Sequence, residues 1–207
     1  FLWAQQTVII GPESFASLGI FTSNPANVWT FTAPINPSSG YLNPTASGVN
    51  AGTLLDNSFT INTYLTTANF STTGKASVTI KFSEWTDGLT IPPKISLEYS
   101  LNSGTSWTDA GFISSATTST YTTLRTLALP ALDNQPTVLV RFRTNAAGSG
   151  SFESYYIDDF TVYGTAPSIN YYNLSGANLN STASWGTATN GTGSSPIDFL
   201  SSNQIFN

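Results

Sequence analysis

The sequence predicts an all-β fold in which two antiparallel sheets pack face to face as a sandwich, followed by a second small β-rich segment. Between Thr7 and Tyr163, about nine strand-like runs are separated by clusters of Gly, Pro, Asn and Ser. No segment repeats its apolar residues with the period of an amphipathic helix. Charged residues make up 8% of the chain and aromatic residues 13%, a balance typical of extracellular β proteins whose solubility depends on hydroxyl and amide groups.

The clearest strand-like runs combine β-branched and aromatic residues with alternating polarity. Prolines fall between these runs, as expected because proline cannot donate a hydrogen bond to a neighbouring strand. The runs are 28–32, 58–64, 76–82, 94–100, 107–113, 120–129, 137–143 and 155–163.

The segment 138–164 is the most regular part of the chain. Val138, Val140 and Phe142 alternate with polar or exposed positions that include Arg141 and Arg143, and a Gly-rich loop then leads into an aromatic run. This pattern predicts a hairpin of two antiparallel strands.

Residues 100–107 match the Asp-box pattern: Ser, any residue, Asp or Asn, any residue, Gly, any residue, Ser or Thr, and Trp. We expect Asn102 and Gly104 to adopt left-handed conformations in a tight turn, with Trp107 folding back over it. The box occurs once, without the repeat spacing of a sialidase propeller, so it predicts a structural hairpin.

Composition excludes several classes of function. The six basic residues are scattered through a chain of net charge -5, so we expect no nucleic-acid binding. The chain contains no Cys and no His, which removes disulfides, Ser-His-Asp triads and the usual zinc ligands. No apolar run is long enough to span a membrane. The apolar start, Phe1 to Ala4, is either a remnant of a secretory signal or part of a first strand.

Two adjacent carboxylates, Asp158 and Asp159, interrupt the last aromatic run. Neighbours in a strand face opposite ways, so one of them could reach a cation at a strand edge. Carboxylate oxygens together with loop carbonyls suit Ca²⁺, for which Asp56 and Glu84 are candidate partners. The alternative is a solvated or hydrogen-bonded role without metal.

The acidic residues do not form the set that glycoside hydrolysis needs. Two carboxylates must face each other across a cleft, and Glu84, Asp87, Glu98 and Glu153 show no close spacing. Glu98 could project from a sheet face. We therefore expect a protein that is not an enzyme.

Aromatic rings are the main candidates for ligand binding, because a flat ring can stack on the C–H face of a sugar. Trp85 lies between two acidic residues at an expected turn, and Tyr155 and Tyr156 begin the last aromatic run. The alternative is that these rings belong to the core. Further candidates are Trp29, Trp107 and Tyr121.

The segments 65–71, 76–82, 97–107, 138–142 and 156–162 resemble, in this order, the jelly-roll modules of Bacteroidetes-type secreted proteins. These include the MAM-like and cleaved-adhesin domains often exported by the type IX secretion system. The resemblance implies a jelly-roll sandwich with an adhesive or accessory role. It also implies Ca²⁺ held by the closing-strand Asp and an acidic N-terminal loop, where this chain has Asn27, Asn36 and Asn43.

We expect two domains, a jelly-roll sandwich at 1–165 and a linker with a partial β-rich second domain at 166–207. The connector 164–168 is turn-forming, and the following residues are rich in Asn, Ser, Thr and Gly.

The predicted function is a non-catalytic, secreted or cell-surface module for adhesion or carbohydrate binding, with a glycan or a surface protein as partner. The alternative is a structural subunit or spacer of an extracellular assembly that self-associates.

Overall fold

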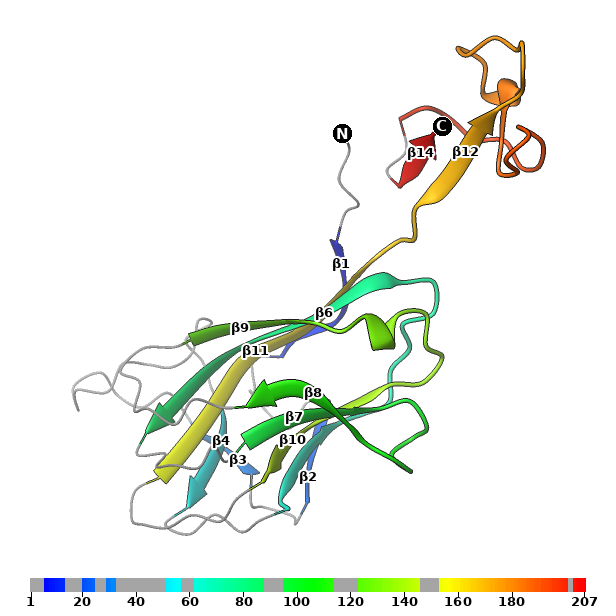
Figure 1. Cartoon of the computed structure of the whole chain (residues 1–207). Helices are drawn as coiled ribbons and strands as arrows, with labels where there is room; N and C mark the ends of the chain where they lie inside the picture. Colours follow the sequence, from blue (N-terminus) through cyan, green and yellow to red (C-terminus); the bar gives the residue numbers. More distant parts are fainter. Residues whose placement is uncertain are drawn as a thin grey trace.

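The computed structural model describes residues 6–13, 20–24, 29–32, 51–56, 62–87, 95–113, 123–145, 153–200 and 203–207. These residues form the predicted two-sheet antiparallel jelly-roll sandwich and, after it, a small β-rich segment (Figure 1). The larger sheet has the strand order β3-β4-β11-β6-β9, with β1 also paired to β11. The second sheet has the order β2-β5-β10-β7-β8.

The strands of the six-stranded sheet are β1 (Gln6–Glu13), β3 (Trp29–Thr32), β4 (Ala51–Asp56), β6 (Ala76–Asp87), β9 (Thr123–Ala128) and β11 (Glu153–Thr165). Those of the five-stranded sheet are β2 (Phe21–Asn24), β5 (Tyr64–Thr67), β7 (Ile95–Ser100), β8 (Thr108–Ile113) and β10 (Leu139–Thr144). A 3-10 turn, η2 (Pro130–Leu132), follows β9.

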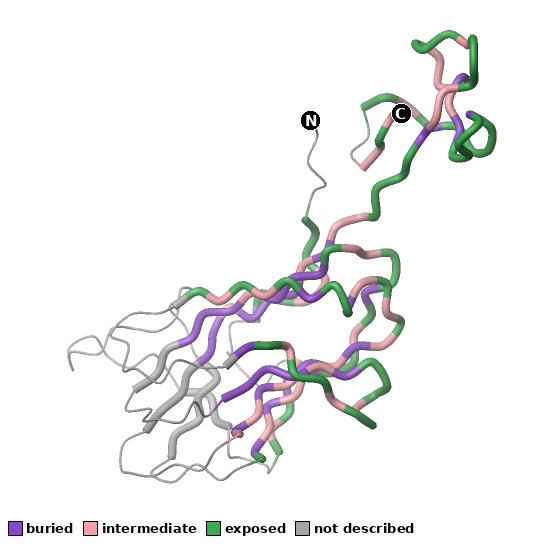
Figure 2. Tube along the Cα trace, viewed as in Figure 1, coloured by how far each residue is buried: buried purple, intermediate pink, exposed green. Residues whose placement is uncertain are grey.

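The core lies between the two sheets and is built by alternate residues of each strand. In β6 the inward residues are Val78, Ile80 and Phe82, all fully buried. The ring of Phe142 from the other sheet meets Phe82 edge to face, with ring centroids 5.0 Å apart, and also contacts Phe160 of β11. Figure 2 shows buried positions along the strands of both sheets. The burial of these large side chains is the main driving force for the sandwich.

The predicted hairpin at 138–164 is wrong in its pairing, although both of its strands exist. β10 pairs with β5 and β7, whereas β11 pairs with β4, β6 and β1, so the two strands belong to different sheets. Alternation shows which residues of a strand face the core, but it does not identify the neighbouring strand. Both strands bury apolar residues in the same core from opposite sides.

The predicted strand at 58–64 is wrong at Asn62 and Thr63, which precede the observed strand. The strand in this region, β5, begins at Tyr64, and Asn62 just before it has a left-handed backbone with φ of 64°. This conformation departs from the extended backbone of a strand, and Asn62 lies in a turn. Residues 57–61 lie outside the described part of the chain.

The turn after β9 is tied to the start of β6 by one carboxylate. Asp133 accepts hydrogen bonds from the backbone amides of Ser77 and Val78, at 3.0 and 2.8 Å. Leu132 beside it is fully buried, and its carbonyl accepts a hydrogen bond from the buried Thr72 hydroxyl. These contacts fix the η2 turn against the edge of the core.

The C-terminal segment forms a three-stranded sheet of its own. Its strands are β12 (Ile169–Asn173), β13 (Trp185–Gly186) and β14 (Gln204–Phe206), in the order β13-β12-β14. The ring of Phe206 stacks on Tyr171 and contacts Trp185, with centroids 5.5 and 5.0 Å away. This sheet stands apart from the sandwich in Figure 1. The division into domains at 165/166 stays a prediction.

Among the described residues, no helix has the length and apolar character needed to cross a bilayer.

Candidate functional site

The outer surface of the five-stranded sheet carries a connected polar and aromatic surface, which we call the arginine face: Asn62, Tyr64, Glu98, Trp107, Arg141 and Arg143. Because Val140 and Phe142 of β10 point into the core, Arg141 and Arg143 point outward. The strand register places Arg141 opposite Glu98 of β7. It also places Arg143 opposite Tyr64 of β5.

Glu98 binds both arginines of this surface. Nε and Nη2 of Arg141 both lie 2.6 Å from Oε2 of Glu98, and Nη1 of Arg143 lies 2.8 Å from Oε1. The Glu98 side chain is only 9% exposed and that of Arg141 15%, so solvent screens this ion pair little. The hydrogen bond to Glu98 is the main cause that raises the pKa of Arg143, against the smaller opposing effect of burial.

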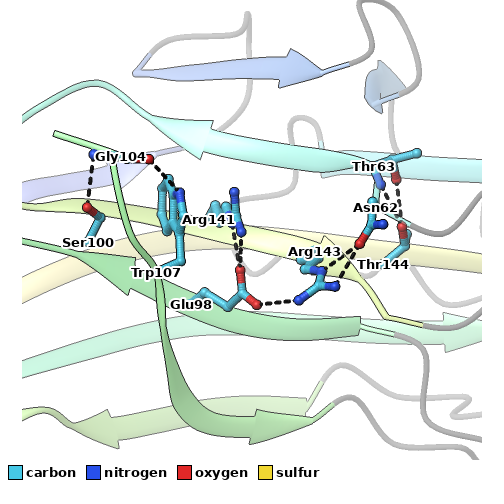
Figure 3. A network of polar contacts seen from close by, with 9 residues as sticks. All are labelled: Asn62, Thr63, Glu98, Ser100, Gly104, Trp107, Arg141, Arg143 and Thr144. Atoms are coloured by element: carbon cyan, nitrogen blue, oxygen red, sulfur yellow. Dashed lines mark hydrogen bonds and ion pairs between the residues drawn. The ribbon is translucent and has the colours of Figure 1, made fainter. Parts of the chain in front are cut away.

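The Arg141 guanidinium lies between two aromatic rings. Its central carbon is 4.2 Å from the ring centroid of Tyr64 and 3.9 Å from that of Trp107. The Trp107 ring is itself fixed, because its Nε1 donates a 3.1 Å hydrogen bond to the carbonyl of Gly104 (Figure 3). Cation–π attraction between desolvated groups of this kind holds rings and cation in one arrangement.

Asn62 closes the other end of the arginine face. Its left-handed backbone turns the amide toward Arg143, whose Nε and Nη2 donate hydrogen bonds of 3.0 and 2.7 Å to Oδ1. The next residue, Thr63, is held by its backbone amide to the buried Thr144 hydroxyl, at 2.8 Å. The polar groups of the face are therefore positioned before any ligand arrives.

The Asp-box hairpin is confirmed as a structural turn between β7 and β8. The Ser100 hydroxyl accepts a hydrogen bond from the Gly104 amide at 2.9 Å, and Oδ1 of Asn102 accepts one from the Ser106 amide at 2.9 Å. The left-handed residues are Ser103 and Gly104, whereas Asn102 was expected to be one of them. The box supplies Trp107 to the arginine face.

The predicted aromatic site lies on the other sheet. Trp85 is in β6 and both tyrosines are in β11, and the register pairs the backbone of Tyr156 with that of Trp85 and Tyr155 with Thr86. The side chains of Trp85, Tyr155 and Tyr156 lie outside the described part of the structure. Their role in ligand binding stays a prediction.

The predicted calcium residues lie at an irregularity of β11. The register of β11 against β6 shifts between Asp158 and Thr161, and Asp159 has a left-handed φ of 54°. The expectation that Asp158 and Asp159 face opposite ways assumed strict alternation along the strand. Alternation does not hold at this irregularity. Asp158 is buried, and Asp159 is half-buried, which raises the pKa of its carboxyl.

The described residues contain no group of three acidic side chains that could hold a metal ion. Of the two candidate partners, Glu84 is buried and forms an ion pair with Arg125, and the side chain of Asp56 is outside the described part. Calcium binding by Asp158 and Asp159 stays a prediction.

The sequence did not single out Asn62, Tyr64, Arg141 and Arg143 as functional. A signal was present for the arginines, because the alternation that predicts Val140 and Phe142 as inward residues also predicts that both arginines share the outer face. Nothing in the sequence showed that Glu98 and Tyr64 would lie beside them, since that depends on strand pairing.

Comparison with known proteins shows the fold. The structure of TmCBM61 in complex with β-1,4-galactotriose has a TM-score of 0.54 and is 14% identical, over 76% of this chain and 99% of that one. The K2 cleaved adhesin domain of Lys-gingipain has a TM-score of 0.46 and 14% identity, over 79% of this chain and 99% of that one. The enzymatically active domain of tailspike protein 4 from bacteriophage CBA120 has a TM-score of 0.46 and 8% identity, over 75% of this chain and 21% of that one.

No protein-family model matches the sequence, and no curated protein matches it either. The likeness to TmCBM61 supports the jelly-roll sandwich that the strand order already shows.

Proposed function

We propose that this chain is a non-catalytic glycan-binding module and that the arginine face is its binding surface. The observation that carries the proposal is the fixed position of Arg141 between Tyr64 and Trp107, with Glu98 and Arg143 bonded beside it. Sugars are bound by aromatic rings together with a few positioned donors and acceptors. TmCBM61, which has a similar fold, is described in complex with a galactotriose.

The same proposal includes the setting predicted from the sequence: a secreted or cell-surface protein in which this module mediates adhesion. The low charge and the abundance of hydroxyl and amide side chains support it. It also includes Trp85, Tyr155 and Tyr156 as a second aromatic contact region on the other sheet.

The direct test is a glycan array, with β-1,4-linked galactose oligosaccharides included, followed by calorimetric titration of any sugar that binds. Arg143→Met removes a partly exposed donor of the arginine face and should weaken binding at least about tenfold, the loss typical of a charged hydrogen bond. Lys75→Met is the matched control, because it also removes one positive charge but lies outside this face. Equal affinities of both variants and the native chain would show that the arginine face is not the binding surface.

The alternative, a structural subunit of an extracellular assembly, is favoured by one observation. The C-terminal segment exposes large apolar side chains, with Ile197 93% and Leu200 83% accessible. Apolar groups exposed to this extent can mark a contact surface. Sedimentation analysis of the native chain and of Ile197→Ser/Leu200→Ser tests this: oligomers that dissociate in the double variant support assembly, and a native monomer at all concentrations contradicts it.

A further inference from the structure

The outer face of the six-stranded sheet, on the other side of the sandwich from the arginine face, contains a hollow of about 540 Å³. It is lined by Pro12 of β1, Leu124 of β9, and residues from the two central strands. Because Ile80, Phe82 and Val162 point into the core, their neighbours along β6 and β11 face outward into this hollow. These neighbours are Lys81, Ser83, Asp159, Thr161 and Tyr163.

The β-bulge in β11 creates the hollow's acidic wall. The register pairs Asp158 with Ser83 and Thr161 with Lys81, so β11 has one residue more than β6 between these pairs. The extra residue allows Asp159, in its left-handed conformation, to line the hollow while Phe160 remains buried in the core. Bulges commonly redirect a side chain in this way beside functional sites.

Two opposite charges line the hollow. The Lys81 ammonium lies 4.7 Å from the ring centroid of Tyr163. Among the described residues, it has no hydrogen bond or ion pair, and neither does the Asp159 carboxylate. The buried floor of the hollow is formed by Thr161 and Ser83. The Thr161 hydroxyl donates a hydrogen bond to the backbone carbonyl of Asp159.

We propose that this hollow is a binding site for a single neutral sugar residue or a similar polyol, separate from the arginine face. A sugar hydroxyl can donate to the Asp159 carboxylate while another accepts from the Lys81 ammonium. The apolar side of the ring can lie on Tyr163 and Leu124. The hollow has one positive and one negative group, so it matches a ligand without net charge.

The same composition disfavours the other ligands that such a hollow could take. A metal cation would be repelled by Lys81, and hard cations need several oxygen ligands with more negative charge. A purely apolar ligand would leave both charged groups desolvated and unpaired, which costs free energy.

The test is a titration of the ¹⁵N-labelled full chain with methyl β-galactoside, methyl β-glucoside and methyl α-mannoside, followed by NMR chemical shifts. At least one sugar, at up to about 50 mM and hence in the range of weak binding, should shift the amides of Lys81, Ser83, Thr161 and Tyr163. Asp159→Asn should raise the dissociation constant at least about tenfold, because a charged acceptor is lost. Asparagine suits the left-handed backbone at this position, so the variant keeps the fold.

A second variant, Lys81→Met, keeps the apolar stem on Tyr163 and should also weaken binding. Lys75→Met should leave binding in the hollow unchanged. Arg143→Met should also leave it unchanged, and this result would distinguish the hollow from the arginine face. The proposal is overturned if none of the three sugars shifts these amides, or if binding is the same in Asp159→Asn and Lys81→Met. Shifts caused by CaCl₂ alone, and absent in Asp159→Asn, would instead make the hollow a cation site.

Discussion

Glu98 is the residue on which the order of the arginine face depends, because both arginines bind its carboxylate. Its ion pair with Arg141 is largely buried. When Arg141 is removed, the Glu98 carboxylate stays desolvated and keeps only the more exposed Arg143 as a compensating charge. We expect Arg141→Met to lower the free energy of unfolding by about 3 kcal/mol.

Arg143→Met provides the comparison, because this arginine is 33% exposed and solvent screens its contact with Glu98. Its expected cost is at most about 1 kcal/mol. Urea unfolding of both variants, followed by circular dichroism, measures the difference. Equal losses in the two variants would show that the greater burial of Arg141 does not make its ion pair with Glu98 more important for the fold.

Asp159 should make stability depend on pH in the sense opposite to that of an ion-paired carboxylate. Burial raises the pKa of its carboxyl above the ordinary value of 3.8, so the folded chain binds this proton more tightly than the unfolded chain does. Tighter proton binding stabilises the folded chain fully at pH values below the ordinary pKa. This stabilisation is lost as the pH rises through the folded-state pKa of Asp159. Asn cannot ionise, so Asp159→Asn should melt at a higher temperature than the native chain near neutral pH.

The melting temperatures of the two proteins should converge near about pH 3, where Asp159 is protonated in both the folded and unfolded states. Asp133→Asn is the control at another carboxylate of the same domain, and it should melt at a lower temperature near neutral pH because Asp133 accepts two backbone hydrogen bonds. A lower melting temperature for Asp159→Asn near neutral pH would contradict the prediction and would indicate a stabilising partner for the carboxylate.

At the scale of elements, the η2 turn and the start of β6 depend on the carboxylate of Asp133. Asp133→Ala removes the acceptor of two backbone amides, and that of Val78 is partly buried. We expect a loss of about 2 kcal/mol of unfolding free energy. Asp133→Asn retains one acceptor oxygen and should lose less. Thermal unfolding measures both, and equal losses would show that the acceptor oxygen retained by asparagine contributes nothing to stability.

The strands and turns also show which features the sequence could predict. Alternation in β10 correctly predicted buried Val140 and Phe142, and the Asp box correctly predicted the β7–β8 turn, because both patterns are local. The pairing of β10 was mispredicted since partners are chosen by contacts far apart in the chain. Asn62 likewise gave no local sign of a left-handed conformation within an apparently strand-like run.

The candidate site was less predictable than the fold for the same reason. Glu98 was correctly expected to project from a sheet face, but its partners come from β10, about 40 positions later. The bulge at Asp159 was not visible in the sequence either, because an extra residue in one strand is defined only against its partner.

At the scale of the whole molecule, the predicted division into domains can be tested with one residue of the C-terminal sheet. A Cβ at Gly186 would overlap the backbone carbonyl oxygens of Gly191 and Thr192. Gly186→Ala should therefore disrupt the sheet of β12, β13 and β14. If the sandwich is a separate domain, its NMR signals should stay unchanged while those of 169–206 move or broaden.

Gly176→Ala is the matched control, since its Cβ would meet open space and only the left-handed backbone, with φ of 76°, opposes it. It should cost about 1 kcal/mol within the C-terminal sheet and leave the sheet folded. Loss of sandwich signals in Gly186→Ala would show that both parts form one cooperative unit.

The pairing of β1 with β11 has a consequence for how this fold can be combined with others. Gln6 lies opposite Thr165, so the chain enters and leaves the sandwich at neighbouring positions of one sheet. A host protein could therefore carry the sandwich as an insertion within a surface loop, because the two host ends would need to separate by little more than the spacing of adjacent strands. Joining these two ends by a short linker and opening the chain elsewhere would, by the same geometry, give a circular permutant.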